Sequence, residues 1–138
     1  MNPVNYTLKS IRELVCDLNE VQTVSVVCVD FKSETSVLLK DDVVLITPIV
    51  KYICENGIRL RFSAEFRFHV DRLKEIVHIA SDASNMEFSV DIIPELLRTS
   101  LDTLRGIIFI KTESLTDFPL PILDNDSLMR HNSYKVVL

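Results

Sequence analysis

Alternation between apolar and polar residues is strongest between Ile58 and Val70. Every even-numbered residue in this stretch is apolar, and every odd-numbered residue is polar or charged. Because successive side chains of a β-strand point to opposite faces, the pattern predicts a strand with one apolar face and one face that carries Arg59, Arg61 and Arg67. The apolar face is expected to belong to the core.

A second apolar run, residues 43–54, precedes this strand, and Asn56 and Gly57 separate the two. Both residues tolerate positive φ, so they predict a two-residue hairpin turn. Without a bulge, such a turn fixes the pairing, and paired residues share a face. The predicted pairs on the core face are Ile53 with Leu60, Lys51 with Phe62, Ile49 with Ala64, Thr47 with Phe66 and Leu45 with Phe68.

The same pairing predicts a mixed surface on the other face of the hairpin. There the arginines are expected beside Val44, Ile46, Val50 and Tyr52. A face that is half charged and half apolar suits partial burial against another subunit, a second layer or a bound segment. The alternative is that the arginine stems simply cover these apolar residues in water. On the first interpretation the face is a candidate protein-binding or oligomer surface.

The N-terminal third is less regular. Residues 7–18 have apolar residues at spacings of three and four, which predicts an amphipathic helix, with a strand as the alternative. Residues 21–31 are rich in β-branched residues and predict a strand that ends in a turn at residues 33–36. Residues 36–55 predict one short and one long strand, or a single strand interrupted at Asp41 and Asp42.

After the hairpin, a short helical turn and a polar loop are predicted between residues 71 and 89. The clearest helix is predicted over residues 92–112, because Asp91 can cap it and Pro94 suits its first turn. Its expected buried stripe has spacings of four, three and four: Leu97, Leu101, Leu104 and Ile108. A second stripe gives the helix another contact surface: Leu96, Thr103, Ile107 and Ile110.

Residues 113–138 predict an extended, acidic tail. Pro119 and Pro121 cannot donate hydrogen bonds to a sheet, so this segment is expected to lie over a surface, anchored by Phe118, Leu120 and Ile122.

Length and composition predict one domain that covers residues 1–138, with its strand-rich part at about residues 20–70. The net charge of -5 argues against a nucleic-acid partner. The N-terminus has no apolar segment typical of a signal peptide, and no run approaches 18 apolar residues, so no membrane insertion and a cytoplasmic location are expected. Three widely spaced cysteines, Cys16, Cys28 and Cys54, suit reduced and mostly buried thiols.

Residues that could carry chemistry do not form a recognisable motif. With glycine only at positions 57 and 106, no glycine-rich phosphate loop is expected. The three histidines fall in different predicted elements and have no metal-ligand spacing, and no cysteine or serine has a local triad motif. We therefore expect a non-enzymatic protein without a metal or other cofactor.

The C-terminal third carries a family resemblance. A long helix that ends near "LRG" is followed by "DFPLPILDNDSLM". This order resembles the SecB-like chaperone family, in which strands and a long helix precede an "FPP…L…P.(V/I)NFD.L"-type segment. Phe118, Pro119, Pro121, Ile122 and Leu128 stand in for the matching parts of that segment. "TLRG" in the helix and "KTE" before the prolines look closer still to uncharacterised bacterial SecB-like relatives.

The resemblance implies an α+β fold with about four antiparallel strands and a long C-terminal helix packed on one face. It also implies a homo-oligomer, a dimer or tetramer, that holds unfolded polypeptides or protein partners in apolar surface grooves without ATP and whose acidic surface docks a basic partner such as an export motor. On this hypothesis the arginine-bearing face, the second stripe through Leu96 and Ile107, and Phe118 are oligomer and client surfaces. The alternative is an interaction module, an adaptor or neutralising partner, for one folded target.

Overall fold

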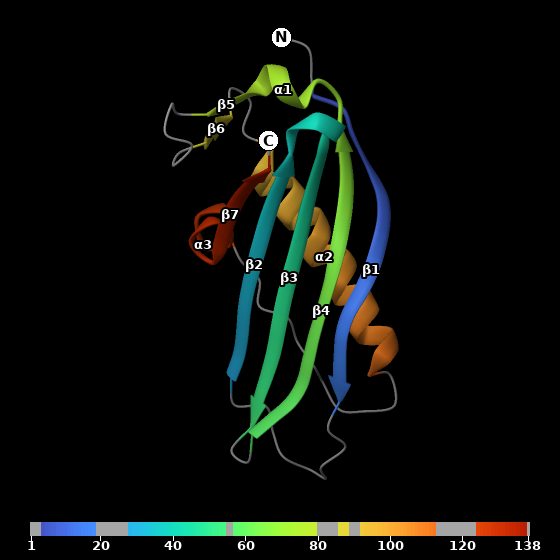
Figure 1. The fold of residues 1–138 in the computed structure, drawn as a ribbon. Coiled ribbons are helices and arrows are strands. Elements are labelled where there is room, and N and C mark those ends of the chain that lie inside the picture. The colour runs from blue at the N-terminus through green and yellow to red at the C-terminus, as the bar shows by residue number, and fades with distance from the viewer. Residues whose placement is uncertain are drawn as a thin grey trace.

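The computed structural model describes residues 4–18, 28–54, 57–79, 86–88, 92–112 and 124–137. Its main feature is a five-stranded sheet with the order β1-β4-β3-β2-β7 (Figure 1). The first four strands are antiparallel to their neighbours, whereas β7 is parallel to β2. The strands are β1 (Tyr6–Leu18), β2 (Cys28–Leu38), β3 (Val43–Cys54), β4 (Gly57–Val70) and β7 (Asn132–Val137).

The four antiparallel strands form a Greek key, because β2, β3 and β4 follow one another and β1 returns beside β4. One long helix, α2 (Ile93–Lys111), crosses a single face of the sheet (Figure 1). The smaller elements are η1 (Leu39–Asp41), α1 (Leu73–Ile76), α3 (Asn125–Arg130) and a separate pair of short strands, β5 (Val77–Ile79) and β6 (Met86–Phe88).

The predicted α+β class, with a mostly antiparallel sheet and a long helix, is confirmed. The sheet has a fifth strand, and the long helix lies in the middle of the chain, because α3 and β7 follow it. The predicted interruption at Asp41 and Asp42 and the short helical turn after β4 are also present; Asp42 has a left-handed φ of 55° at the end of η1.

Strand β1 corrects the predicted helix over residues 7–18; the alternative, a strand, is right. Its pairing with β4 is irregular between Leu8 and Ser10 and again between Glu13 and Val15. Each irregularity leaves one residue of β1 without an opposite partner, as in a β-bulge.

These two bulges explain the misleading spacing. Leu8, Ile11, Glu13 and Cys16 all oppose even-numbered residues of β4 and so share one face of the sheet. The steps from Leu8 to Ile11 and from Glu13 to Cys16 are three residues long because each crosses a bulge. A bulged strand thus has the three-residue spacing that is typical of a helix.

Residues 33–36 do not turn the chain as predicted, since they lie inside β2. Ser33 and Thr35 are 2% and 0% exposed. Each hydroxyl donates a hydrogen bond of 2.8 Å to Oδ1 of Asn132 in β7. Two buried polar side chains are stable here because a partner almost a hundred residues further along the chain satisfies them. No local pattern indicates that partner.

The predicted pairing of β3 with β4 is wrong. The pair nearest the turn is Cys54 with Gly57, whose φ is 130°, whereas a turn at Asn56-Gly57 requires Glu55 to pair with Ile58. Both residues of the observed pair are thus one position earlier in the chain. This difference alone would leave the faces unchanged. A further irregularity between Tyr52 and Ile53 then moves the pairing by one more residue. A shift of one residue exchanges the faces of the strand.

We call the face of the sheet that α2 covers the inner face and the opposite one the outer face. The even-numbered residues of β3, not the odd-numbered ones, share the inner face with the phenylalanines of β4. The observed pairs are Val44 with Phe68, Ile46 with Phe66, Val50 with Phe62 and Tyr52 with Leu60.

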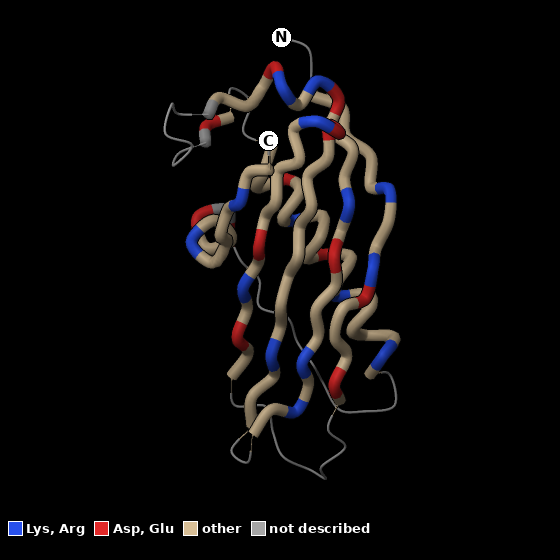
Figure 2. Tube along the Cα trace, viewed as in Figure 1, with Lys and Arg blue, Asp and Glu red and all other residues tan. Residues whose placement is uncertain are grey.

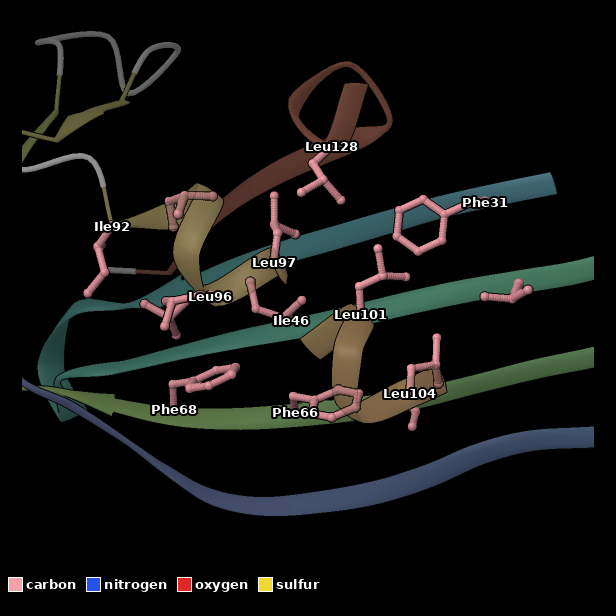
Figure 3. Close-up of a cluster of buried hydrophobic side chains, with 14 of the residues drawn as sticks. Phe31, Ile46, Phe66, Phe68, Ile92, Leu96, Leu97, Leu101, Leu104 and Leu128 are labelled. Carbon is pink, nitrogen blue, oxygen red and sulfur yellow. The ribbon is translucent and has the colours of Figure 1, made fainter. Parts of the chain in front are cut away.

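The core lies between this inner face and α2 (Figure 3). The predicted stripe of α2, Leu97, Leu101, Leu104 and Ile108, is at most 2% exposed, which confirms the prediction. Pro94 occupies the first turn as expected, and Ile92 precedes the helix without a side-chain cap. The proposed cap, Asp91, lies outside the described residues.

The predicted extended tail is corrected where the structure describes it. Asp124 caps α3, since its side chain accepts a hydrogen bond of 2.7 Å from the backbone N–H of Ser127. Leu128 of α3 is fully buried against the core, and β7 then pairs with β2. The proline segment, residues 118–122, lies outside the described residues.

Candidate functional site

Four of the predicted surface residues lie in the core instead. Val44, Ile46, Val50 and Tyr52 are fully buried on the inner face of the sheet. Burial raises the pKa of the Tyr52 phenol, and the nearby Arg105 opposes that shift. These side chains already contact the rest of their own chain, so they offer no surface to a partner in this fold.

Arg61 and Arg67 lie on the outer face, as the alternation predicts, opposite Lys51 and Leu45 of β3. Arg59 falls at the register shift near Tyr52 and Ile53, so the pairing assigns it to neither face. The apolar neighbours of Arg61 and Arg67 on the outer face are Leu45, Ile49 and Ile53, which are partly buried. The outer face is therefore a mixture of charged and apolar residues, as predicted, although the apolar members differ. α2 lies on the opposite side of the sheet, and no helix in the described part of the chain covers this face (Figure 1).

Charges on the outer face are arranged in cross-strand rows. Arg12 of β1 and Glu65 of β4 form an ion pair of 3.3 Å. Near the hairpin end, where Figure 2 shows several basic residues, Arg61 stands directly opposite Lys51, and Asp17 and Asp30 follow on the neighbouring strands. The Arg61 Nε is buried without a hydrogen-bond partner. Arg61 also stands directly opposite Asp17, and Lys51 directly opposite Asp30, and these opposite-charge pairs offset the repulsion between the two cations.

The second stripe of α2 changes its exposure along the helix. Leu96 is fully buried, Thr103 and Ile107 are partly buried, and Ile110 is 69% exposed. The neighbouring Phe109 is 72% exposed. Figure 1 shows why: α2 crosses the sheet obliquely, and its C-terminal end extends past β1, the edge strand. Near that end, none of the described strands lies beneath the apolar flank of the helix.

Strand β1 contributes two further exposed apolar side chains close to this end, Ile11 at 41% and Leu14 at 44%. An ion pair of 3.1 Å between Lys111 Nζ and Glu13 Oε1 joins the last turn of α2 to the middle of β1. The hydrogen bond with Glu13 raises the pKa of Lys111. Partial burial, together with a hydrogen bond to Glu13, raises the pKa of the Cys16 thiol nearby. Cys16 and Cys28 are exposed and only Cys54 of the three cysteines is buried, so the prediction of mostly buried thiols is wrong.

We call these residues the α2–β1 surface: Ile11, Leu14, Ile107, Phe109 and Ile110. Of these, only Ile107 belongs to the predicted site, and Phe118 lies outside the described residues. Ile11 and Leu14 were hidden by the assumption that residues 7–18 form a helix. Phe109 could have been recognised from the sequence, because it is a large apolar residue that belongs to neither stripe of α2.

The described residues include an open cavity but no candidate metal centre. No group of three or more His, Cys, Asp or Glu side chains among them could hold a metal ion. An open cavity of about 460 Å³ at the hairpin end of the sheet is lined by Cys16, Asp17, Leu18, Ile58 and Arg61. Within the described ranges, no helix has the length and apolar character needed to cross a membrane.

Comparisons with known proteins found no family model, curated protein or solved structure that matches this chain.

Proposed function

We propose that this protein is a non-enzymatic, SecB-like polypeptide-binding protein that holds unfolded or partner proteins on apolar surfaces of an oligomer. The observation that carries the proposal is the exposure of Phe109 and Ile110 at the end of α2, together with that of Ile11 and Leu14 on the edge strand, which an ion pair joins to this end of the helix. Large apolar side chains that gather on one exposed surface are typical of protein-binding sites.

The expected binding energy per site is small. Full burial of a side chain such as Phe or Ile stabilises a contact by about 1.5–3 kcal/mol. A single α2–β1 surface would therefore hold a client weakly. Two or more copies in one oligomer would bind several segments of the same unfolded chain, and this multivalency raises the overall affinity without new contacts. Oligomerisation is thus part of the proposed mechanism.

A light-scattering assay tests the proposal. The native protein is expected to slow aggregation of a chemically denatured test protein during dilution into buffer. Phe109→Asp with Ile110→Asp should abolish this effect, because both substitutions place charge where apolar contacts form. The matched control, Thr7→Asp with Ser133→Asp, adds two acids at exposed positions elsewhere on the sheet and should retain it. Equal activity of the two double variants, with both folded, would refute the proposal.

The outer face favours a second candidate function, an interaction module for one folded target. Its supporting observation is the row of charges Asp17, Arg61, Lys51 and Asp30 across four strands. A folded partner with the complementary arrangement of charges would recognise this row. Affinity purification separates the two functions, since a single stoichiometric folded partner, lost on Lys51→Glu, supports the module and a spread of unfolded clients supports the chaperone.

A further inference from the structure

Strand β2 has β3 along one side over its whole length, whereas β7 lies beside only its second half (Figure 1). The pairing with β3 runs from Cys28 to Leu38, and the pairing with β7 runs from Ser33 to Leu38. Among the described strands, residues 28–32 are therefore an open edge of the sheet on the side of β7. The backbone groups of such an edge can pair with another strand.

One hydrogen bond shows which backbone groups of this edge are available. The N–H of Ser33 donates to the carbonyl of His131 over 2.9 Å, so the backbone groups of Ser33 point toward β7. This direction alternates along a strand, and the pairing of β2 with β3 has no register shift. The N–H and C=O groups of Val29 and Phe31 therefore point to the same side, in line with β7, while those of the even-numbered residues point to β3.

An open cavity of about 270 Å³ lies where this edge meets the beginning of β7. Lys32, Arg130 and His131 line it, and Glu34 is the one acid among the described lining residues. Arg130 uses one terminal nitrogen for a hydrogen bond of 3.0 Å to Ser127 Oγ, and a guanidinium has five donors in all. The cavity therefore suits an anion, and a carboxylate matches the planar geometry of the guanidinium.

We propose that the β2 edge and this cavity together bind the carboxyl-terminal segment of a polypeptide. The segment pairs with residues 28–32 and places its terminal carboxylate in the cavity. Backbone pairing supplies affinity for any extended chain, and capture of the carboxylate restricts binding to a chain end. The site lies at the opposite edge of the sheet from β1. It is thus independent of the α2–β1 surface and of the function proposed for that surface.

The charges of the cavity set the direction of the bound segment. A strand in line with β7 cannot continue beyond Phe31 and Lys32, because β7 occupies the edge from Ser33 onward. If the segment runs parallel to β2, its C-terminus arrives at the cavity. If it runs antiparallel, its N-terminal ammonium group meets Lys32 and Arg130, and like charges in contact are unfavourable. Lys32 is one residue from Phe31, about 3.3 Å, so a carboxylate that ends beside Phe31 is close to the cavity.

Fluorescence anisotropy with two labelled heptapeptides tests the carboxylate. Both have the sequence Gly-Ser-Gly-Thr-Val-Thr-Val, which favours an extended strand; one ends in a free carboxylate and the other in an amide. The acid should bind about tenfold more tightly, because it alone forms charge-assisted hydrogen bonds. Lys32→Gln with Arg130→Gln should abolish this difference. The matched control, Lys9→Gln with Lys74→Gln, also changes two exposed bases and should keep it. Equal binding of the two peptides, or none at about 1 mM, would overturn the proposal.

Amide exchange measured by NMR tests the strand pairing. At saturation, the acid peptide should slow exchange of the Val29 and Phe31 N–H groups by about tenfold or more. Exchange at Asp30 and Lys32, whose N–H groups point to β3, should change little. If Val29 and Phe31 are already protected without peptide, or remain unprotected when the peptide binds, the edge is not the binding site and the proposal fails.

A further variant separates this site from the proposed function. Phe109→Asp with Ile110→Asp should leave the affinity for the acid peptide within about twofold of the native value, because distant sites act independently. Loss of peptide binding in this variant, with the protein folded, would contradict a separate site. If the native protein does not slow aggregation but still prefers the acid peptide, the carboxylate site stands and the proposed function fails.

Discussion

The two faces of the β3–β4 hairpin differ although their sequences on β3 are almost equally apolar. Val44, Ile46 and Val50 on the inner face are fully buried, whereas Leu45 and Ile49 on the outer face are only partly buried. On β4 the difference is already present in the sequence, since phenylalanines alternate with arginines. The inner face is therefore set by the alternation along β4 and by the packing of α2. The pairing of β3 with β4 then decides which residues of β3 lie on that face.

The comparison teaches that an apolar residue on this sheet need not belong to its core. The outer face keeps apolar residues between its charges, and the end of α2 keeps Phe109 and Ile110 exposed. Both features suit contacts with other molecules, and among the described elements a helix covers the inner face only.

The largest expected effect compares two isoleucines of β3. Ile46→Ala should lower the free energy of unfolding by about 2–5 kcal/mol, because it opens a cavity between the sheet and α2. Ile49→Ala removes the same atoms from the outer face and should cost about 1 kcal/mol or less. Urea unfolding followed by circular dichroism measures both values. Equal costs would mean that the outer face is buried as deeply as the inner one.

An intermediate effect is expected at the polar part of the inner face. Asn132→Ala should cost about 1–3 kcal/mol, because the hydroxyls of Ser33 and Thr35 lose their acceptor while buried. Adding Ser33→Ala and Thr35→Val removes those hydroxyls and should recover part of the loss. No recovery in the triple variant would show that Asn132 acts through the β7 backbone and not through this hydrogen-bonded cluster.

The smallest effect concerns α3, which closes the inner face with Leu128. Hydrogen bonds from Ser127, first from its backbone N–H, hold the pKa of the Asp124 carboxyl below its ordinary value, and Arg130 and Arg98 add to the shift. A group whose pKa is depressed by folding stabilises the folded state above its unfolded pKa, about 3.9, and this contribution is lost as the pH falls through the lower folded value.

We therefore expect amide exchange in α3, measured by NMR, to speed up below about pH 4 relative to exchange in β3. Asp124→Asn keeps a capping oxygen but does not titrate, so it should remove this acid sensitivity. If exchange in α3 of the Asn variant responds to acid like that of the native protein, the cap is not the cause.

Several elements could be predicted because their residues repeat with the period of one structure. The stripe from Leu97 to Ile108 has only the spacing of a helix, and the alternation from Ile58 to Val70 has only that of a strand. The segments that were predicted wrongly have no apolar spacing that belongs to one structure alone. Residues 7–18 have the apolar spacing of a helix because two bulges lengthen the spacing along a strand. Residues 33–36 have the composition of a turn, and Asn132, the partner that satisfies them inside a strand, is remote in the sequence.

Of the predicted site residues, Arg61 and Arg67 lie on the outer face of the sheet and Ile107 is partly buried, while Val44, Ile46, Val50, Tyr52 and Leu96 are in the core. For the residues of β3, the error follows from one irregularity between Tyr52 and Ile53. Since almost every residue of β3 is apolar, either register buries apolar side chains, and the sequence does not distinguish between them.

By itself, the sequence determined the α+β class, the two faces of β4 and the buried stripe of α2, because each is set by a local alternation of apolar and polar residues. Only the tertiary structure decided which face of β3 is buried, that β1 is a bulged edge strand, and that β7 pairs beside β2. Each of those depends on backbone hydrogen bonds between segments that are distant in the chain, and such pairing has no local periodicity to reveal it.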